Sequence, residues 1–269
     1  MDITYKAFFG LKEEPFRSDL KLNNILQTEN LKAVKTRFDY TVRVGGAAVV
    51  TGEIGSGKTT ALRYASEVLH PSEYRVIYIT ATSGPILELY RQICTELAIG
   101  PVSRSKAAMT RIIKKEIKEL TDEKKMKAVL IVDEASQLRL EVLSELHTIT
   151  QFNKDSRHCL PVILAGQGLL VDKLKYRTSE PLASRIIARS HLKGLDREGM
   201  EQYLSHHLEL TGSKARIFED AAVTAVHQGA GGLLRKANHL ARGAMMAAAH
   251  EKSQLVNAEH VRRAATEVF

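Results

Sequence analysis

Short, nearly continuous apolar runs recur along the first two thirds of the chain. Five of them lie at residues 47–51, 75–80, 128–132, 160–165 and 186–192. None alternates regularly between apolar and polar positions, and such runs are typical of strands that are buried on both faces. Most of the intervals between them are long enough for a crossover helix. The pattern therefore predicts an α/β fold with a five-stranded parallel sheet flanked by helices.

Apolar residues recur at helical spacing in these intervals and throughout the chain after the last predicted strand. Between the strands this spacing predicts helices at residues 58–69, 85–97, 105–120 and 138–150, and beyond the last strand at 197–210, 220–228, 232–250 and 257–269. Asp196 and Asn257 are candidate N-caps, and Gly212 follows the first of the later helices. We expect an α/β domain over residues 1–193 and a small helical domain over residues 194–269.

Composition narrows the class of protein. Of the 269 residues, 44% are hydrophobic and 26% are charged, which is ordinary for a globular protein and argues against disorder and collagen-like repetition. The two cysteines, Cys94 and Cys159, are far apart and each lacks a CxxC partner, which excludes a structural zinc finger or a redox pair. We expect both to be buried and the compartment to be reducing.

Charge and hydropathy indicate the cellular location of the protein and allow one class of partner. The chain has no apolar run of 18 residues, and acids and a proline stand near its N-terminus where a signal peptide needs an apolar core. We therefore expect a cytoplasmic protein with no membrane partner. The 39 basic and 31 acidic residues give a net charge of +8, which permits an anionic partner such as nucleic acid but does not require one.

The sequence GEIGSGKT at residues 52–59 matches the phosphate-binding pattern G-x-x-x-x-G-K-[ST] and lies between a predicted strand and a predicted helix. Glycines allow backbone N–H groups to turn around a polyphosphate, and the following helix N-terminus favours negative charge. Lys58 would reach the β- and γ-phosphates of ATP, and the Thr59 hydroxyl would bind Mg²⁺. The candidate nucleotide contacts are Gly52, Glu53, Ile54, Gly55, Ser56, Gly57, Lys58, Thr59 and Thr60.

A second motif, AVLIVDE at residues 128–134, follows about 70 residues later. An apolar strand that ends in two acids places carboxylates at the carboxyl edge of the sheet, where open α/β folds bind their ligands. Asp133 would hold Mg²⁺ together with Thr59, and Glu134 would act as general base toward the attacking water. The pair of acids favours a hydrolase over a simple nucleotide switch.

These motifs, with others in the same order, resemble the AAA+ ATPases, specifically the ExeA/GspA-like group and the related transposition regulators of the TnsC, MuB and IstB type. The matching segments cover nearly the whole chain and lie at residues 8–16, 52–60, 164–167, 182–186 and 231–238. The resemblance implies a P-loop AAA+ fold whose C-terminal helices form a lid, with ATP and Mg²⁺ as cofactors and a homo-oligomer, either ring or filament, as the working form.

The resemblance also implies roles for three further residues. Gln167 stands where related proteins have a polar sensor of the γ-phosphate. Arg185, or alternatively Arg189, would be the finger that reaches the neighbouring subunit's site, a role that suits the permanently charged guanidinium. Arg235 would be a second sensor on the lid. The alternative for each arginine is an ordinary salt bridge. Phe16 or Ile25 could contact the adenine base, although core packing is an equally good reading of both.

The segment 101–127 contains nine Lys or Arg and four Asp or Glu residues. In the initiator-like AAA+ proteins an extra helical element of this region touches the DNA backbone, and by resemblance the candidate contacts are Ser103, Arg104, Lys106 and Arg111. Such contacts would add salt dependence without sequence specificity. The alternative is a solvated helix face with pairs such as Lys115 and Glu119.

Three functions follow from the sequence. The first is an ATPase that oligomerises on duplex DNA and recruits or activates a transposase. The second is an ExeA-type secretion-associated ATPase; because such proteins usually continue past the lid and this chain stops at Phe269, we expect the first function instead. The third is a nucleotide-gated scaffold without catalysis, against which Lys58, Asp133 and Glu134 argue.

Overall fold

The computed structural model describes residues 5–100, 104–153, 156–213 and 215–268. They form two compact units. The α/β unit contains Glu29–Gly52 and Lys58–Leu192. The helical unit contains the described parts of residues 1–28 and 193–269 together with Glu53–Gly57.

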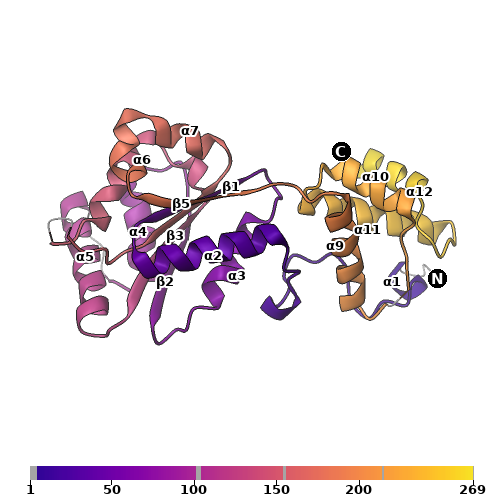
Figure 1. Cartoon of the computed structure of the whole chain (residues 1–269), viewed down its shortest axis with the longest axis horizontal. Coiled ribbons are helices and arrows are strands. Elements are labelled where there is room, and N and C mark those ends of the chain that lie inside the picture. The colour runs from indigo at the N-terminus through magenta and orange to yellow at the C-terminus, as the bar shows by residue number, and fades with distance from the viewer. Residues whose placement is uncertain (1–4, 101–103, 154–155, 214, 269) are drawn as a thin grey trace. The chain divides into compact units, whose positions relative to one another are not determined.

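The α/β unit is built on a parallel sheet with the strand order β2-β3-β4-β1-β5. Figure 1 shows this sheet together with the helices of the unit. The prediction of five parallel strands is confirmed, with each strand within about two residues of its expected bounds. The strands are β1 (Ala47–Gly52), β2 (Tyr74–Thr80), β3 (Lys127–Asp133), β4 (Val162–Gly166) and β5 (Ile186–Leu192). The three inner strands are buried almost throughout, whereas the edge strands β2 and β5 are partly exposed.

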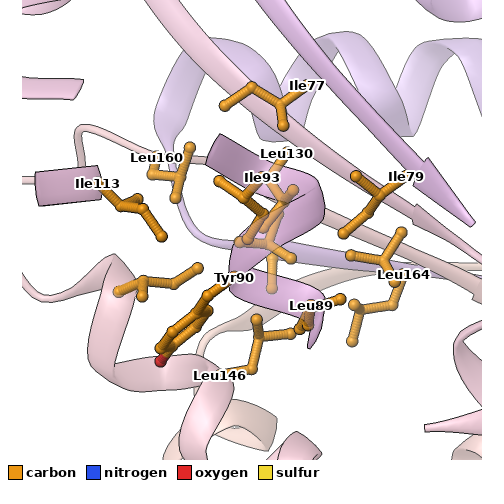
Figure 2. Packing of buried hydrophobic residues seen from close by; sticks show 14 of the residues in the cluster. Ile77, Ile79, Leu89, Tyr90, Ile93, Ile113, Leu130, Leu146, Leu160 and Leu164 are labelled. Atoms are coloured by element: carbon orange, nitrogen blue, oxygen red, sulfur yellow. The ribbon is translucent and has the colours of Figure 1, made fainter. Parts of the chain in front are cut away.

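Helices and short 3₁₀ turns connect the strands of this unit. They are α2 (Glu29–Val44), α3 (Lys58–Glu67), α4 (Ile86–Glu96), α5 (Lys106–Asp122), η2 (Ala135–Gln137), α6 (Leu140–Leu146), η3 (His147–Thr150), α7 (Leu169–Lys175), η5 (Arg177–Ser179) and α8 (Glu180–Ala183). Figure 2 shows one side of the core, where Ile93 of α4 lies beside Leu130 of the sheet and Tyr90 points toward Leu146 of α6. Neither Tyr90 nor Ile93 is exposed to solvent.

Several features of this unit differ from the prediction, and no helix was predicted at α2, α7 or α8. The buried residues Leu31, Val34, Phe38 and Val42 of α2 nevertheless recur at helical spacing. The predicted helix at 138–150 is instead α6 followed by η3. The Thr148-Ile149-Thr150 run is β-branched and loses rotamer freedom in an α-helix, and the Thr150 hydroxyl bonds the carbonyl of His147, which favours the tighter turn.

The helical unit consists of α1 (Tyr5–Phe8), η1 (Leu22–Asn24), α9 (Arg197–Leu210), α10 (Asp220–Ala230), α11 (Leu234–His250) and α12 (Ala258–Val268). The predicted cap of α9 is confirmed, since Asp196 accepts a 2.8 Å hydrogen bond from the Gly199 N–H. Asn257 likewise accepts bonds from the N–H groups of Glu259 and His260. These side chains satisfy N–H groups that a helix start otherwise leaves without partners.

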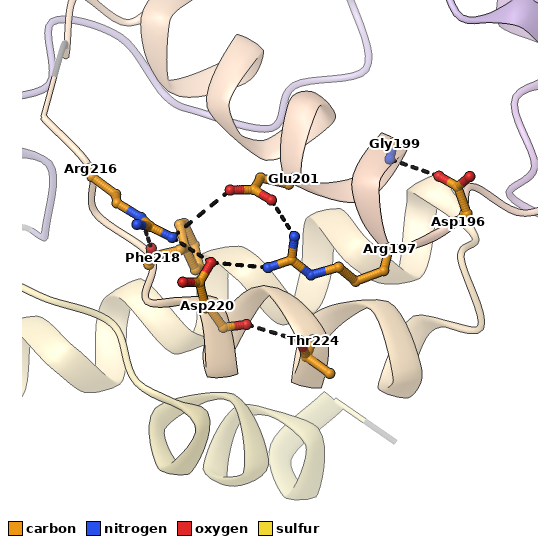
Figure 3. A network of polar contacts seen from close by, with 8 residues as sticks. All are labelled: Asp196, Arg197, Gly199, Glu201, Arg216, Phe218, Asp220 and Thr224. Atoms are coloured by element: carbon orange, nitrogen blue, oxygen red, sulfur yellow. Dashed lines mark hydrogen bonds and ion pairs between the residues drawn. The ribbon is translucent and has the colours of Figure 1, made fainter.

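An alternating set of charges joins the start of α9 to the start of α10 (Figure 3). Arg197 pairs with both Glu201 and Asp220, and Arg216 approaches the same two carboxylates. The charge of Arg216, more than any other neighbour, lowers the pKa of Asp220. Because the network is largely exposed, we expect it to orient the two helices more than to stabilise them.

The N-terminal segment packs within the helical unit. The Lys12 N–H donates to the Thr211 carbonyl at 3.0 Å, and an Arg242 Nη2 donates to the Phe16 carbonyl at 3.1 Å. Phe16 is 2% exposed and stacks on His207 with a ring distance of 5.5 Å, so core packing rather than contact with a base accounts for its burial. Residues 5–28 therefore group with the C-terminal helices, whereas the predicted division at 193/194 placed them in the α/β domain. That these units are separate domains remains a prediction.

Candidate active site

Three neighbouring strands bring the candidate residues to one edge of the sheet. β4 lies between β1 and β3, with Thr51 paired to Gly166 and Leu164 paired to Val132. The carboxyl ends of parallel strands share an edge, so the loop after β1, Gln167 after β4 and the acids after β3 meet there. This adjacency follows from the strand order and not from the order along the chain.

The residues that flank the phosphate loop are tied together. The Lys58 ammonium, at the first position of α3, donates to the Gly52 carbonyl at 3.0 Å and is only 5% exposed. Within the loop the Ser56 hydroxyl is buried and has no hydrogen-bond partner among the described residues. A buried ammonium and an orphaned hydroxyl both suit an anionic ligand with several oxygen acceptors.

The loop segment Glu53–Gly57 is itself part of the helical unit. The Arg235 N–H donates to the Gly55 carbonyl at 3.2 Å, and a Cβ added at Gly55 would lie 2.8 Å from the Cβ of Arg235. Gly55 also has φ of +81°, which side-chain-bearing residues rarely adopt. The start of α11, which carries Arg235, is therefore in direct backbone contact with the predicted phosphate loop, while the exposed Arg235 side chain makes no ion pair with any described residue.

Asp133 is the most fully satisfied carboxylate of the site. It is 4% exposed and accepts three hydrogen bonds, two at Oδ2 from Thr59 Oγ1 (2.7 Å) and Tyr78 OH (2.8 Å) and one at Oδ1 from the Glu134 N–H (2.8 Å). Three donors fix the orientation of this buried carboxylate. Thr59 and Asp133 are thus joined by a hydrogen bond, and their role as metal ligands stays a prediction.

Tyr78 was not identified from the sequence. It lies on β2, where the neighbouring Thr80 pairs with Asp133 in the sheet register. Burial, and then the charge of Asp133, raise the pKa of its phenol, which keeps the hydroxyl protonated and able to donate. A tyrosine in a strand is unremarkable by itself, so only the pairing of β2 with β3 could have pointed to it.

The Thr59 and Asp133 pair fits a divalent cation. Asp133 accepts a hydrogen bond from the Thr59 hydroxyl, which leaves the lone pairs of Oγ1 for a metal. Hydroxyl and carboxylate oxygens are the ligands that Mg²⁺ prefers. No cluster of three or more His, Cys, Asp or Glu side chains that could hold a metal exists among the described residues. A Mg²⁺ ion here would depend on these two side chains, phosphate oxygens and water.

Glu134 has an unusual backbone. Its φ of 53° and ψ of 30° lie in the left-handed region, where a side-chain-bearing residue is disfavoured by about 1–2 kcal/mol. The conformation is held by hydrogen bonds on both sides, from the Glu134 N–H to Asp133 and from the Gln137 N–H to the Glu134 carbonyl at 2.8 Å. Strain of this kind is found where surrounding structure fixes a functional residue.

The two candidates for the finger, Arg185 and Arg189, lie away from this edge. The Arg185 carbonyl accepts from the Ala47 N–H at 2.8 Å, which places Arg185 at the amino end of β1 and β5. Arg189 pairs with Val49 in the middle of the edge strand and is exposed. At about 3.3 Å per residue, the length of β1 puts Arg185 roughly 15–20 Å from the phosphate loop of its own chain. The structure therefore does not bring Arg185 into the site of the same chain.

The described candidate DNA contacts lie on α5 and the turn that precedes it. Arg104, Lys106 and Arg111 are exposed, while Ser103 lies outside the described residues. Lys106 pairs with Glu145 at 2.9 Å, and with Arg111 it lines a groove of about 640 Å³ between α4, α5 and η3. The expected pair of Lys115 and Glu119 is present at 3.4 Å. Cys94 and Cys159 are buried free thiols, as predicted.

Comparison with known protein sequences places the chain in a family context. Residues 42–174 match the family described as AAA domain. The chain is 32% identical over 248 residues to general secretion pathway protein A of Aeromonas hydrophila, which covers 91% of this chain but only 45% of that protein. It is 26% identical over 276 residues to the ATP-dependent target DNA activator B of Escherichia phage Mu, covering 98% of this chain and 77% of the phage protein.

Solved structures agree on the fold. Cdc6p from Pyrobaculum aerophilum matches with a TM-score of 0.71 and 17% identity over 98% of this chain and 71% of that one. RuvB from Thermotoga maritima matches with a TM-score of 0.57 and 20% identity over 97% and 73% of the two chains. Separately, no helix within the described ranges combines the length and the apolar character that crossing a bilayer requires.

Proposed function

We propose that this AAA+ protein, a P-loop ATPase related both to general secretion pathway protein A and to the phage Mu target DNA activator, hydrolyses ATP in a Mg²⁺-dependent reaction and thereby controls its own assembly on duplex DNA. The assembled protein would recruit or activate a transposase at the target. Similarity to the phage Mu protein along 98% of this chain supports the DNA-directed part of the proposal. The joining of Thr59 to Asp133 beside Glu134 is the observation that carries the catalytic part.

In this proposal each group at the sheet edge has one task. The polyphosphate of ATP would lie along residues 52–60, with Lys58 exchanging the Gly52 carbonyl for phosphate oxygens. Thr59 and Asp133 would hold Mg²⁺, which when bound neutralises charge on the phosphates. Glu134 would accept a proton from the attacking water, and Gln167 would orient that water or contact the γ-phosphate. Arg235 would report the γ-phosphate to the helical unit.

Hydrolysis would be coupled to assembly through an arginine from the next protomer. Because Arg185 stands at the end of the sheet opposite its own phosphate loop, a contribution to catalysis requires the site of a second copy. A guanidinium that contacts phosphate only in the ATP state would favour the oligomer in that state. We retain Arg189 as the alternative finger.

DNA would be held through its backbone. Arg104, Lys106 and Arg111 are accessible on α5 and the turn that precedes it, and Ser103 remains a proposed contact. Such contacts neutralise phosphates and are largely indifferent to sequence. Lys106 would leave Glu145 to reach a phosphate, an exchange between exposed partners that costs little.

Electron microscopy with duplex DNA, with and without a slowly hydrolysed ATP analogue, tests this function. We expect ATP-dependent coating of DNA by the wild-type protein and persistent coating by Glu134→Gln, which would bind ATP without cleaving it. Lys58→Ala, which removes the buried ammonium, should neither bind nucleotide nor assemble. Rapid release of DNA by Glu134→Gln would contradict the proposal.

The second candidate is a secretion-associated ATPase that does not bind DNA. The 32% identity to general secretion pathway protein A over 91% of this chain favours it, although the chain spans less than half of that relative. An ATPase whose rate and oligomeric state ignore DNA would select this candidate. Nucleotide-dependent assembly without any hydrolysis would select the nucleotide-gated scaffold. A cytoplasmic location is part of the first proposal.

A further inference from the structure

The general-base candidate Glu134 is followed directly by the 3₁₀ turn η2. A lysine from another helix donates hydrogen bonds to carbonyls at the end of this turn. The Lys173 ammonium of α7 donates to the Ser136 carbonyl at 2.7 Å and to the Leu138 carbonyl at 2.6 Å. Both acceptors lie at the end of η2, where helical carbonyls have no partner of their own. Lys173 is half-buried, so two short charge-assisted bonds in this setting are strong ones.

The same turn is confined on its other side by β4. A Cβ added at Gly166 would lie 2.8 Å from the Ser136 backbone nitrogen and 3.1 Å from its Cβ and Oγ. No other residue type would let the turn approach the strand so closely. The turn is therefore held between the end of β4 and a cation from the helix that follows it.

The segment 166–173 thus contacts, at two points, the turn that follows the candidate general base. Gly166 contacts the turn, Gln167 is the proposed γ-phosphate sensor, and α7 begins two residues later and supplies Lys173 on its second turn. A shift of this segment would move the carbonyls of η2 and, through them, the strained backbone of Glu134. Such a connection can transmit the state of one group to the other because packed elements move as units.

We infer that Lys173 is a positioning residue for ATP hydrolysis: its ammonium holds η2 so that Glu134 keeps its left-handed backbone and presents its carboxylate to water. The inference rests on the proposed ATPase function. Lys173 itself touches neither phosphate nor water in this role. Misplacement of a catalytic group by about 1 Å can lower a rate by about 100-fold, which sets the scale of the effect.

The test compares Lys173→Met, which keeps the aliphatic stem and removes the charge, with Lys175→Met on the same helix. Lys175 is an exposed residue that pairs only with Asp172 among the described residues, so its removal controls for the loss of a lysine from α7. We expect Lys173→Met to lower kcat by about 10- to 100-fold with the affinity for ATP unchanged within about twofold. Lys175→Met should match the wild type in both.

Amide hydrogen exchange of the nucleotide-free protein supplies a readout that does not need turnover. We expect faster exchange at residues 134–138 in Lys173→Met, with no change in β1 or α3. Lys173→Arg should restore slow exchange and part of kcat, because a guanidinium can also donate to both carbonyls. Unchanged exchange at these residues in Lys173→Met would show that the turn does not depend on the Lys173 ammonium.

Three results would overturn the inference: wild-type kcat in Lys173→Met, a kcat loss matched by an equal loss of ATP affinity, or unchanged exchange at residues 134–138. The second of these would mean that the lysine stabilises the fold in general. Failure of the proposed function is a separate result, namely a wild-type protein that binds no nucleotide or does not hydrolyse it. In that case the exchange comparison still decides whether Lys173 holds the turn.

Discussion

The Tyr78 hydroxyl and Thr59 Oγ1 donate hydrogen bonds to the same oxygen of Asp133, at 2.8 and 2.7 Å. Tyr78 thus shares the carboxylate that we propose as a Mg²⁺ ligand and limits its rotation. Thr59 is the other proposed ligand, so a tyrosine on the edge strand β2 shares a hydrogen-bond acceptor with one of the two proposed ligands and donates to the other. Residues that orient a metal ligand in this way affect metal affinity more than they affect folding.

We predict that Tyr78→Phe lowers the affinity of the nucleotide site for Mg²⁺ by about 10-fold, so that Mg²⁺-dependent nucleotide binding needs a correspondingly higher Mg²⁺ concentration. Binding measured without Mg²⁺ should be unchanged, because the ring and its packing remain. Titration of a fluorescent ATP analogue at a series of Mg²⁺ concentrations measures both. Tyr74→Phe on the same strand is the control, since the Tyr74 hydroxyl makes no hydrogen bond among the described residues. Equal Mg²⁺ dependence in Tyr78→Phe and wild type would refute the prediction.

A methyl group at Gly55 should disrupt the phosphate loop. Gly55→Ala places a Cβ 2.8 Å from that of Arg235 and holds a φ of +81° that alanine adopts at a penalty of about 1–2 kcal/mol. We expect ATP affinity to fall by at least about 10-fold in calorimetric titration. Gly100→Ala, where the added group meets nothing within 4 Å, should bind ATP normally. Normal affinity in Gly55→Ala would show that the loop is free to rearrange.

The stability of the helical unit should fall in mild acid because of His207. This side chain is 3% exposed, and burial, followed by the charge of His206, lowers its pKa to about 4. The unfolded chain takes up a proton near pH 6.5 and the folded chain does not, so this contribution is fully present above pH 6.5 and is lost as the pH falls toward 4. Between pH 7 and pH 5 it amounts to about 2 kcal/mol.

Urea denaturation at several pH values measures this contribution. His207→Leu removes the titrating group, so its stability should depend less on pH over this range, whatever its stability at pH 7. His239→Gln, at an exposed position of α11, should keep the wild-type pH dependence. Parallel curves for His207→Leu and the wild type would show that other groups set the pH dependence.

The identity of the finger can be decided by mixing variants. Arg185→Ala should bind ATP normally but hydrolyse it about 1,000-fold more slowly or worse, the usual loss when such an arginine is removed. Mixed with Glu134→Gln, it should recover part of the activity. In a mixed oligomer the Arg185→Ala protomer keeps Glu134 in its own site, and a neighbouring Glu134→Gln protomer supplies the missing arginine. If Arg189→Ala behaves in this way and Arg185→Ala does not, Arg189 is the finger.

Backbone binding of DNA predicts a change in salt dependence. Charge reversal at Arg104 and Arg111 should weaken DNA binding on all sequences and reduce the slope of log K against log [salt] by about two, without altering ATP affinity. Lys115→Glu is the control on the same helix, since Lys115 already pairs with Glu119. Unchanged affinity and slope in the double variant would exclude this surface.

The phosphate loop, the acids after the third strand and all five strands could be predicted from sequence, because each depends on neighbours along the chain. Gly52, Lys58 and Thr59 act through one turn and the helix that follows, and the strands show as unbroken apolar runs. The caps at Asp196 and Asn257 were predictable for the same reason. The helix α2 carries a helical pattern too, so that its periodicity could have been recognised.

The supporting contacts depended on tertiary structure. Tyr78 reaches Asp133 across 55 residues of sequence, and Lys173 reaches Ser136 across 37. The N-terminal segment packs on helices that begin more than 150 residues later, as the hydrogen bond from the Lys12 N–H to the Thr211 carbonyl shows. The local sequence determined which groups we propose as ligands of phosphate and metal. Only the pairing of strands and helices decided which side chains hold those groups in place, because a hydrogen bond between distant segments depends on where the fold puts them and leaves no periodic signal in either segment.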